Sequence, residues 1–227
     1  MRWAPPCAAP RPAMAIEVEA KFLADGPAPL TRLAAAGHLG RAALGPARTF
    51  DETDRYLDTD DGRLEAAGWA CRLRQRGASV RISLKGPPDA ATGGFLHQRP
   101  EVEAPATESL DPSAWPASEA REMVERLSDG RPLRERFRLV QRRTERGVDL
   151  DGSSVGTLSL DEVAVRHDGH SAGTLFAVEL ELALGSEVHS AATDALSELG
   201  RELEAQHGLE PDTRTKVQHA LALIGAA

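Results

Sequence analysis

Charged and apolar residues alternate in five short segments of this chain, beginning with Glu-Val-Glu-Ala-Lys at residues 17–21. Successive side chains of a β-strand point to opposite faces, so this spacing places charge on one face and Val18 and Ala20 on the other. The same spacing of charged residues recurs at 72–74, 81–85, 101–103 and 179–181. The pattern therefore predicts several strands that each have one charged face.

Turn signals and helical patterns separate these segments. Strands are predicted around residues 17–21 and at 55–59, 69–75, 79–85, 95–104, 137–147, 155–165 and 175–184. Residues 69–75 and 79–85 are expected to form a hairpin across Arg76-Gly77-Ala78. Helices are predicted at 30–44, at 118–127 after the N-cap Ser118, at 186–207 before Gly208, and after Pro211.

The charged faces of these strands need water or a charged ligand, while their apolar faces need helices to cover them. Eight antiparallel strands that close into a barrel, with charge in the lumen and helices packed outside, meet both needs. We therefore predict an α+β fold built on an eight-stranded antiparallel β-barrel. A chain of 227 residues is long enough to form it as one domain.

Such a lumen would hold acidic and basic side chains in similar numbers. The acidic candidates are Glu17, Glu19, Glu101, Glu103, Asp161, Glu179 and Glu181. The basic candidates are Lys21, Arg72, Arg74, Arg81, Lys85, Arg142 or Arg143, and Lys216. Clustered carboxylates bind hard divalent cations such as Mg²⁺ or Mn²⁺, whereas arginine and lysine bind phosphate oxygens. A triphosphate that carries a divalent cation matches both halves of this set.

Composition narrows the class of ligand. The net charge of −8 and the scarcity of aromatic residues, five Phe, three Trp and one Tyr, argue against nucleic-acid binding. With two cysteines, Cys7 and Cys71, neither a disulfide framework nor a cysteine-based zinc site is expected. The seven histidines have no metal or base partner at useful spacing, and we expect them on the surface.

The first 13 residues hold four prolines and two arginines but no apolar run of signal-peptide length. We interpret residues 1–13 as a disordered leader or as the result of an upstream start codon. No later stretch is apolar for long enough to cross a bilayer. The expectation is a cytoplasmic protein without a membrane partner, either a monomer or a homodimer.

The ordered set of motifs resembles the CYTH superfamily, the triphosphate tunnel metalloenzymes. The resemblance covers residues 14–224. Its elements are Glu17-x-Glu19-x-Lys21, Tyr56-x-Asp58-Thr59, Arg72-x-Arg74, Lys85, Glu101-x-Glu103, an arginine in the sixth strand, Asp161, Glu179-x-Glu181 and Thr215-Lys216. In the sixth strand either Arg142 with Arg146, or Arg143 alone, points inward, and the resemblance favours Arg143. Asp58 would either contact metal or stabilise a turn. Tyr56 would either contact substrate or pack inside the barrel.

The resemblance implies an antiparallel tunnel that binds triphosphates with divalent metal and cleaves them. Phosphate would be held by Lys21, Arg72, Arg74, Lys85 and Lys216, and by Arg143 or Arg142. Metal would be held by Glu17, Glu19, Glu101, Glu103, Asp161, Glu179 and Glu181. A second metal or one carboxylate of the Glu179 and Glu181 pair would activate a water, and the basic rows, Lys85 among them, would stabilise the leaving oxygen. Whether the C-terminal segment plugs the barrel stays open.

Four functions fit these residues to different degrees. Inorganic triphosphate needs only the basic and acidic candidates given above, so an inorganic triphosphatase ranks first. A thiamine- or nucleoside-triphosphatase would add an aromatic platform, for which Trp69, Phe95 and Trp115 are available. An adenylate cyclase would need a purine pocket, and no residue set specifies one. A non-catalytic polyphosphate or nucleotide sensor would use the basic rows without turnover and would gain nothing from seven acids in its lumen.

Overall fold

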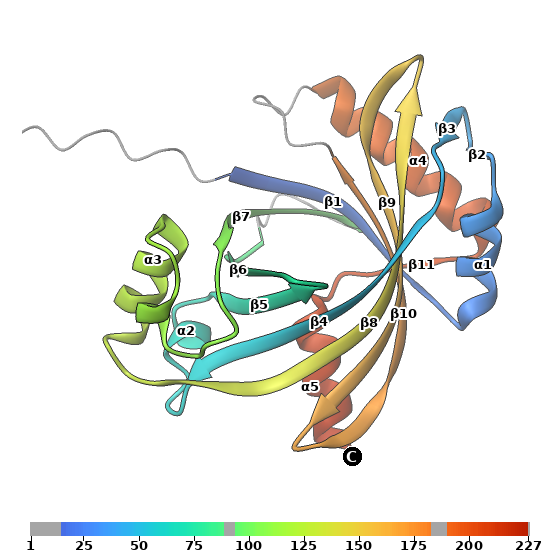
Figure 1. Ribbon diagram of the computed structural model, residues 1–227. Coiled ribbons are helices and arrows are strands. Elements are labelled where there is room, and N and C mark those ends of the chain that lie inside the picture. Colours follow the sequence, from blue (N-terminus) through green and yellow to red (C-terminus); the bar gives the residue numbers. More distant parts are fainter. Residues whose placement is uncertain (1–14, 89–93, 183–189, 227) are drawn as a thin grey trace, which may run out of the picture.

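The barrel is present and closed. The computed structural model describes residues 15–88, 94–182 and 190–226, so the predicted leader and Cys7 lie outside the described residues. The eight strands of the ring are β1 (Ala15–Ala24), β4 (Arg48–Thr59), β5 (Ala70–Arg76), β6 (Ser79–Lys85), β7 (Leu96–Pro105), β8 (Leu133–Leu150), β9 (Ser153–His167) and β10 (His170–Leu182). They pair antiparallel in the order β8-β4-β5-β6-β7-β1-β10-β9, and β9 returns to β8 (Figure 1). The predicted α+β fold is confirmed.

The strand register turns the charged faces inward. Across β1 and β10, Glu19 lies opposite Glu181 and Lys21 lies opposite Glu179. The intervening residues Val18, Ala20 and Phe22 are buried on the outer side, in a core that also contains residues of α1 and α4. Period-two alternation in the sequence therefore separates an ionic interior from an apolar exterior within single strands.

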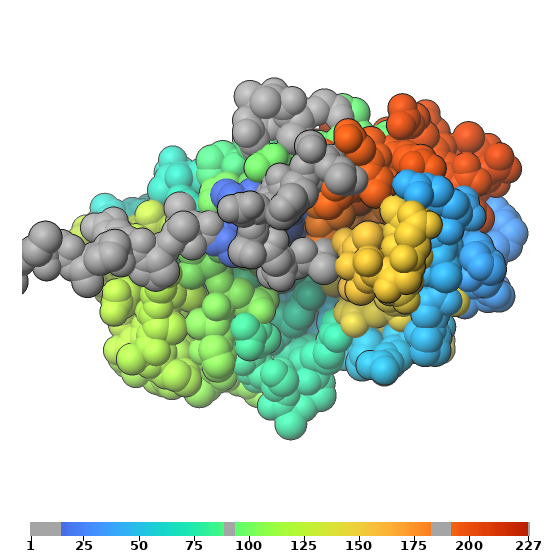
Figure 2. Space-filling view, turned by 90° about the horizontal axis from the view of Figure 1, so that it is seen from above, coloured from blue at the N-terminus to red at the C-terminus, as the bar shows by residue number. Residues whose placement is uncertain are grey.

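Two groups of helices cover opposite parts of the barrel (Figure 2). Helices α1 (Pro27–Ala35) and α4 (Ser190–His207) pack on β1, β9 and β10. Helices α2 (Arg63–Ala66) and α3 (Glu119–Ser128) pack on β4 to β7, next to the 3₁₀ turn η1 (Pro112–Ala114). None of these helices, nor any other in the described part of the chain, is long and apolar enough to cross a membrane.

Several boundaries follow local chemistry that the sequence shows. Ser118 caps α3 as predicted, because its hydroxyl accepts the Arg121 N–H at 3.2 Å. The Asp58 carboxylate accepts the N–H groups of Thr59, Leu64 and Glu65 at 2.7–3.0 Å, which supports its interpretation as a turn residue. The predicted start of α4 at residue 186 and the end of the strand at 184 lie outside the described residues.

The predicted helix at residues 30–44 is wrong in its second half. Helix α1 stops at Ala35, and the chain then forms a small hairpin, β2 (His38–Leu39) and β3 (Ala42–Leu44). Gly40 has φ of 54°, the left-handed conformation that glycine adopts without strain. Leu39 and Leu44 are buried on the main core, and β3 pairs with β8. The alanine-rich composition of this stretch concealed the break.

Helix α5 (Lys216–Ala226) covers inward-facing residues at one end of the barrel. The short strand β11 (Glu210–Pro211) pairs with β1 and leads into it. Ala220 of α5 packs in an apolar cluster with Tyr56, Phe137, Leu139, Val163 and Val165. These strand residues share the inner faces of β4, β8 and β9 with the charged lumen residues, and Tyr56 stacks on Phe137 at a centroid distance of 4.7 Å. The C-terminal helix therefore plugs this end (Figure 1).

Arg146 fixes the α1–β3 region to the barrel from outside. Its side chain donates 2.8–3.1 Å hydrogen bonds to the carbonyl oxygens of Leu33, Ala34, Leu44 and Gly45 and also contacts that of Ala36. Arg146 is 6% exposed. One guanidinium thus satisfies the carbonyls at the C-terminal end of α1, which lack partners within the helix.

Arg146→Met should therefore be strongly destabilising. Loss of the guanidinium leaves several buried carbonyls without a donor, and we expect a cost of about 2–4 kcal/mol in the free energy of unfolding. Urea denaturation measures it. Arg142→Met is the matched control on the same strand, and the exposed Arg142 should change the value by less than about 0.5 kcal/mol. Equal effects for both variants would contradict the structural role of Arg146.

Candidate active site in the barrel lumen

The lumen contains a cavity of about 680 Å³ that is lined mainly by charged side chains. The nine basic residues of its lining are Lys21, Arg72, Arg74, Arg81, Lys85, Arg99, Arg136, Arg143 and Lys216. The seven acidic residues are Glu17, Asp58, Glu65, Glu101, Glu103, Glu179 and Glu181. Every basic residue predicted from the inward-facing pattern, except Arg142, lines this one space.

On one wall, strands β1, β6 and β7 form a compact ion-pair cluster. Arg99 Nε donates to Glu17 Oε2 at 2.7 Å and its Nη2 to Glu19 Oε1 at 3.0 Å. Lys85 Nζ donates to Glu17, and Lys21 Nζ lies 3.9 Å from Glu19. Burial opposes ionisation of Glu17, but Lys85 and Arg99 outweigh it and lower its pKa to about 2. Glu17 is therefore ionised throughout the neutral range.

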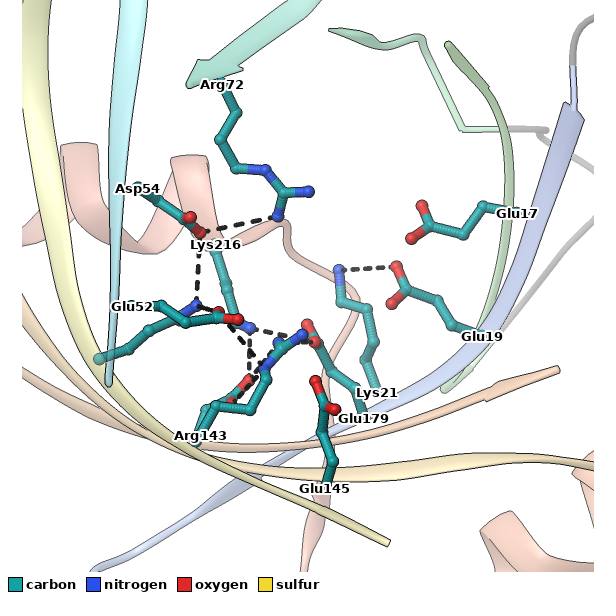
Figure 3. Close-up of polar contacts among 12 residues, drawn as sticks. Glu17, Glu19, Lys21, Glu52, Asp54, Arg72, Arg143, Glu145, Glu179 and Lys216 are labelled. Atoms are coloured by element: carbon teal, nitrogen blue, oxygen red, sulfur yellow. Dashed lines mark hydrogen bonds and ion pairs between the residues drawn. The ribbon is translucent and has the colours of Figure 1, made fainter. Parts of the chain in front are cut away.

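On the opposite wall, β8, β9, β10 and α5 meet at a second cluster (Figure 3). Arg143 binds both oxygens of Asp161 at 2.6–2.7 Å and reaches Glu179 at 2.9 Å. Lys216 Nζ donates to Asp161 at 2.7 Å and to Glu179 at 3.0 Å. Burial disfavours the charged form of Glu179, yet Lys216 and Arg143 hold its pKa well below the usual range. Lys216 thus reaches the lumen from the plugging helix.

The third cluster, on β4 and β5, contains residues that sequence analysis missed. Asp54 is fully buried and binds Arg74 through two 2.7 Å bonds, with Arg72 Nη1 at 3.6 Å. Glu52 is equally enclosed, and its carboxylate contacts Arg76 and Gln141. Other lumen residues that were not predicted are Arg76, Arg99, Gln141 and Glu145. Glu52-Thr53-Asp54 has the same alternating signal as the predicted strands, but β4 begins seven residues earlier than expected.

Arg142 does not face the lumen, which corrects its assignment as a phosphate ligand. It is exposed on the outer face of β8, while its neighbours Gln141 and Arg143 are buried inside. Period-two alternation cannot turn adjacent residues to one side, and the inward turn of Arg143 sends Arg142 and Arg146 outward. The sequence did not decide which residues of this strand point inward, because Leu139 and Val140 are adjacent and both apolar.

Two acidic candidates occupy distinct positions at one edge of the lumen. Glu101 has a buried Oε1 for which the described residues offer no hydrogen-bond partner, and it lies 3.6 Å from Lys85 Nζ and 3.8 Å from Arg72 Nη2. Glu103 pairs with Arg81 at 2.5 Å, and both side chains are more than one-third exposed. Glu101 therefore faces the basic residues of the lumen, whereas Glu103 and Arg81 lie at its more open rim.

The expectation of surface histidines is wrong for His97 and His219. His97 is 8% exposed and contacts the carbonyl oxygen of Asp212, and His219 contacts the Asp212 carboxylate with its side chain 12% exposed. His189 lies outside the described residues. Burial of these two rings was not readable from sequence spacing, because their common partner is supplied by the turn before α5.

A family comparison agrees with this architecture. The model of the CYTH domain matches residues 15–221, which is most of the chain. The chain belongs to the CYTH domain family. Comparison with curated proteins gave no match. The motifs that suggested this family from sequence lie, with the exceptions given above, around the lumen of its CYTH barrel.

Solved structures share the CYTH fold at low identity. A candidate adenylyl cyclase from Hippeastrum with a dominant triphosphatase activity is 19% identical, with a TM-score of 0.63 and coverage of 91% of this chain and 95% of that chain. A candidate adenylate cyclase from Bacillus halodurans is also 19% identical, with a TM-score of 0.60 and coverage of 91% and 98%. A chain of the Schizosaccharomyces pombe Mediator head module is 11% identical, with a TM-score of 0.55 and coverage of 86% and 98%. At these identities the likeness establishes the fold, and function must be argued from the site.

The donor chemistry of the CYTH lumen fits a hard divalent cation, although no ligand shell is preformed. Among the described residues, no three His, Cys, Asp or Glu side chains are grouped so that they would hold a metal. Glu17 and Glu19 instead turn toward Arg99. Glu181 is half-buried, and burial together with Glu17, Glu19 and Glu179 raises its pKa to about 7. These repelling carboxylate oxygens are the donors that Mg²⁺ and Mn²⁺ prefer.

Glu181 gives a pH-dependent prediction for the metal-free protein. Its folded-state pKa of about 7 exceeds the ordinary 4.5, so the native state favours the protonated form and stability falls as pH rises between these values. Glu181→Gln should remove this loss and raise the free energy of unfolding by about 1–3 kcal/mol at pH 8.

The measurement is urea denaturation in EDTA at pH 8 and at pH 4.5. Little difference between Glu181→Gln and the parent is expected at the lower pH, where the parent carboxyl is largely protonated in the native state. Glu162→Gln, on the exposed face of β9, is the control and should show no such dependence. A gain of equal size at both pH values would contradict the prediction.

Proposed function

We propose that this protein is a metal-dependent triphosphatase that hydrolyses a phosphoanhydride bond of a triphosphate, with inorganic triphosphate as the first candidate substrate. The supporting observation is the convergence of Lys21, Arg72, Arg74, Lys85 and Arg143, together with Arg99 and Lys216, on one 680 Å³ cavity. Several rigidly held cations around one space recognise a polyanion better than any neutral ligand. The same cavity also contains carboxylates, which a site that only binds anions would not need.

Each wall of the lumen has a part in this proposal. Two pairs of basic residues bind phosphate oxygens. Asp54 holds the first pair, Arg72 and Arg74. Asp161 and Glu179 hold the second pair, Arg143 and Lys216. Lys85 and Lys21 approach from β6 and β1 and stabilise charge that develops on the leaving oxygen. A divalent cation would be held by Glu17 and Glu19, with Glu101, Glu103, Asp161 or Glu179 as further oxygen donors, and would supply charge neutralisation on the phosphates.

The proton of the attacking water goes to a carboxylate on β10. Glu181 is the better acceptor, because burial and its acidic neighbours raise its pKa to about 7, so it binds a proton more strongly than Glu179. Glu179 is bound by Arg143 and Lys216, and its lowered pKa makes it a weaker base. Water attack in line with the leaving oxygen needs no covalent intermediate on the enzyme.

One observation favours a second candidate, a thiamine- or nucleoside-triphosphatase. The cavity lining also includes Trp69, Leu57, Pro87 and Leu221, which contribute an apolar section that inorganic triphosphate does not need. An organic group attached to the triphosphate would contact such residues. An adenylate cyclase, which would release a cyclic nucleotide and pyrophosphate, ranks third.

Phosphate release from inorganic triphosphate, thiamine triphosphate and ATP, with Mg²⁺ or Mn²⁺ and with EDTA, tests the proposal. Metal-dependent release that is fastest with inorganic triphosphate is the expected result. Faster release from an organic triphosphate would promote the second candidate, and cyclic AMP formed from ATP would promote the third. Tight triphosphate binding without turnover under all conditions would make the protein a sensor and would overturn the proposal.

Variants separate binding from chemistry. Arg74→Ala should weaken triphosphate binding about tenfold to a hundredfold, because a charge-assisted contact is lost. Glu181→Gln should lower kcat by about 10²–10⁴ while triphosphate still binds. Calorimetric titration in EDTA and initial rates with metal measure the two effects. Arg142→Ala is the control for charge and should leave both values unchanged. Unaltered binding by Arg74→Ala would contradict the assigned substrate site.

A further inference from the structure

Asp212, in the turn between β11 and α5, joins three elements of the structure although it lies outside the cavity lining. Its backbone N–H donates to the Lys21 carbonyl oxygen at 2.9 Å, and its own carbonyl oxygen accepts from His97 Nε2 at 2.6 Å. Its carboxylate contacts His219 Nε2 at 2.9 and 3.0 Å and accepts the Arg214 N–H at 2.9 Å. Asp212 is 6% exposed, so these contacts are shielded from water.

The segment between Asp212 and His219 contains the start of α5. Thr215 Oγ1 accepts the Gln218 N–H at 3.2 Å, and Gln218 Oε1 accepts the Thr215 N–H at 2.8 Å. This reciprocal pair is a capping box, which defines where the helix begins. Lys216, the first residue of α5, then extends into the lumen and binds Asp161 and Glu179.

Apolar contacts alone do not fix how α5 is rotated. Ala220, with Val217 and Leu223, packs against the barrel, and such contacts are non-directional. The bond from Asp212 to His219 is directional, and it links the helix to the residue that is bound to the backbone of β1. Lys21 of that strand lies opposite Glu179, the same carboxylate that Lys216 binds. The buried contact between Asp212 and His219, called the joint below, therefore aligns Lys21 of β1 with Lys216 of α5.

We propose that Asp212 and His219 are positioning residues that set the reach of Lys216 into the phosphate-binding lumen. Neither residue lines the 680 Å³ cavity, and both act through the rotation of α5. The inference rests on the proposed function, because it requires Lys216 to bind triphosphate. Loss of the joint leaves α5 packed on its apolar face but allows the Lys216 ammonium to withdraw from Glu179 and Asp161.

A double-mutant cycle tests this role in the full chain. The affinity for inorganic triphosphate is measured by calorimetry in EDTA, where no turnover occurs, for His219→Leu, Lys216→Met and the double variant. We expect His219→Leu to weaken binding about 5- to 20-fold in the parent and less than twofold in the Lys216→Met background, because coupled residues are non-additive. Asp212→Ala, which removes the side-chain acceptor of His219, is the second variant and should behave in the same way.

Exposed residues nearby provide the controls. His170→Leu, at the start of β10, and Glu210→Gln, in β11, should leave affinity unchanged. An equal loss of affinity in both backgrounds, or a lower Tm for His219→Leu with unchanged affinity, would overturn the positioning role. Unchanged affinity for Lys216→Met and Lys85→Ala would instead overturn the proposed function, so the two failures are distinguishable.

Discussion

Charge balance inside the barrel is the constraint on which the rest of this structure depends. A carboxylate or guanidinium that leaves water is stable only when an opposite charge or several hydrogen bonds meet it. Asp54, Asp161 and Glu17 are each buried, and each is held by two basic side chains from neighbouring elements. Strand register, inward alternation and the position of α5 all serve to bring these partners together.

The same constraint bears on how a polyanion would bind under the proposed function. Most of the lumen cations are already paired with carboxylates of the chain, so a triphosphate would enter by exchange of partners and not by filling an empty positive pocket. Glu181 lies near Glu17, Glu19 and Glu179, which raise its pKa, and Glu101 Oε1 is buried with no hydrogen-bond donor among the described residues. At these two carboxylates the internal charge balance is incomplete.

Most of the fold was predictable because period-two alternation of charge is a strong signal in barrel strands. The inward residues of β1, β5, β6 and β10 followed from it. The cap of α3 followed from a separate signal, the N-cap preference of Ser118. The break after Ala35 was not predictable from composition, since alanine favours a helix, and the strand β3 is imposed by its pairing with β8. The roles of Glu52, Arg99 and His219 depended on partners distant in sequence, and only the packed structure brings those partners within bonding distance.

The pairing of β1 with β10 has a consequence for how the molecule is made. Glu19 and Glu181 become neighbours only after nearly all intervening strands have been synthesised, so the ring stays an open sheet through most of translation. An open sheet with an apolar inner face would be prone to aggregate at that stage. Here much of the face that awaits closure is ionic, and its apolar section at Tyr56, Phe137, Leu139, Val163 and Val165 is covered by α5, which is synthesised last.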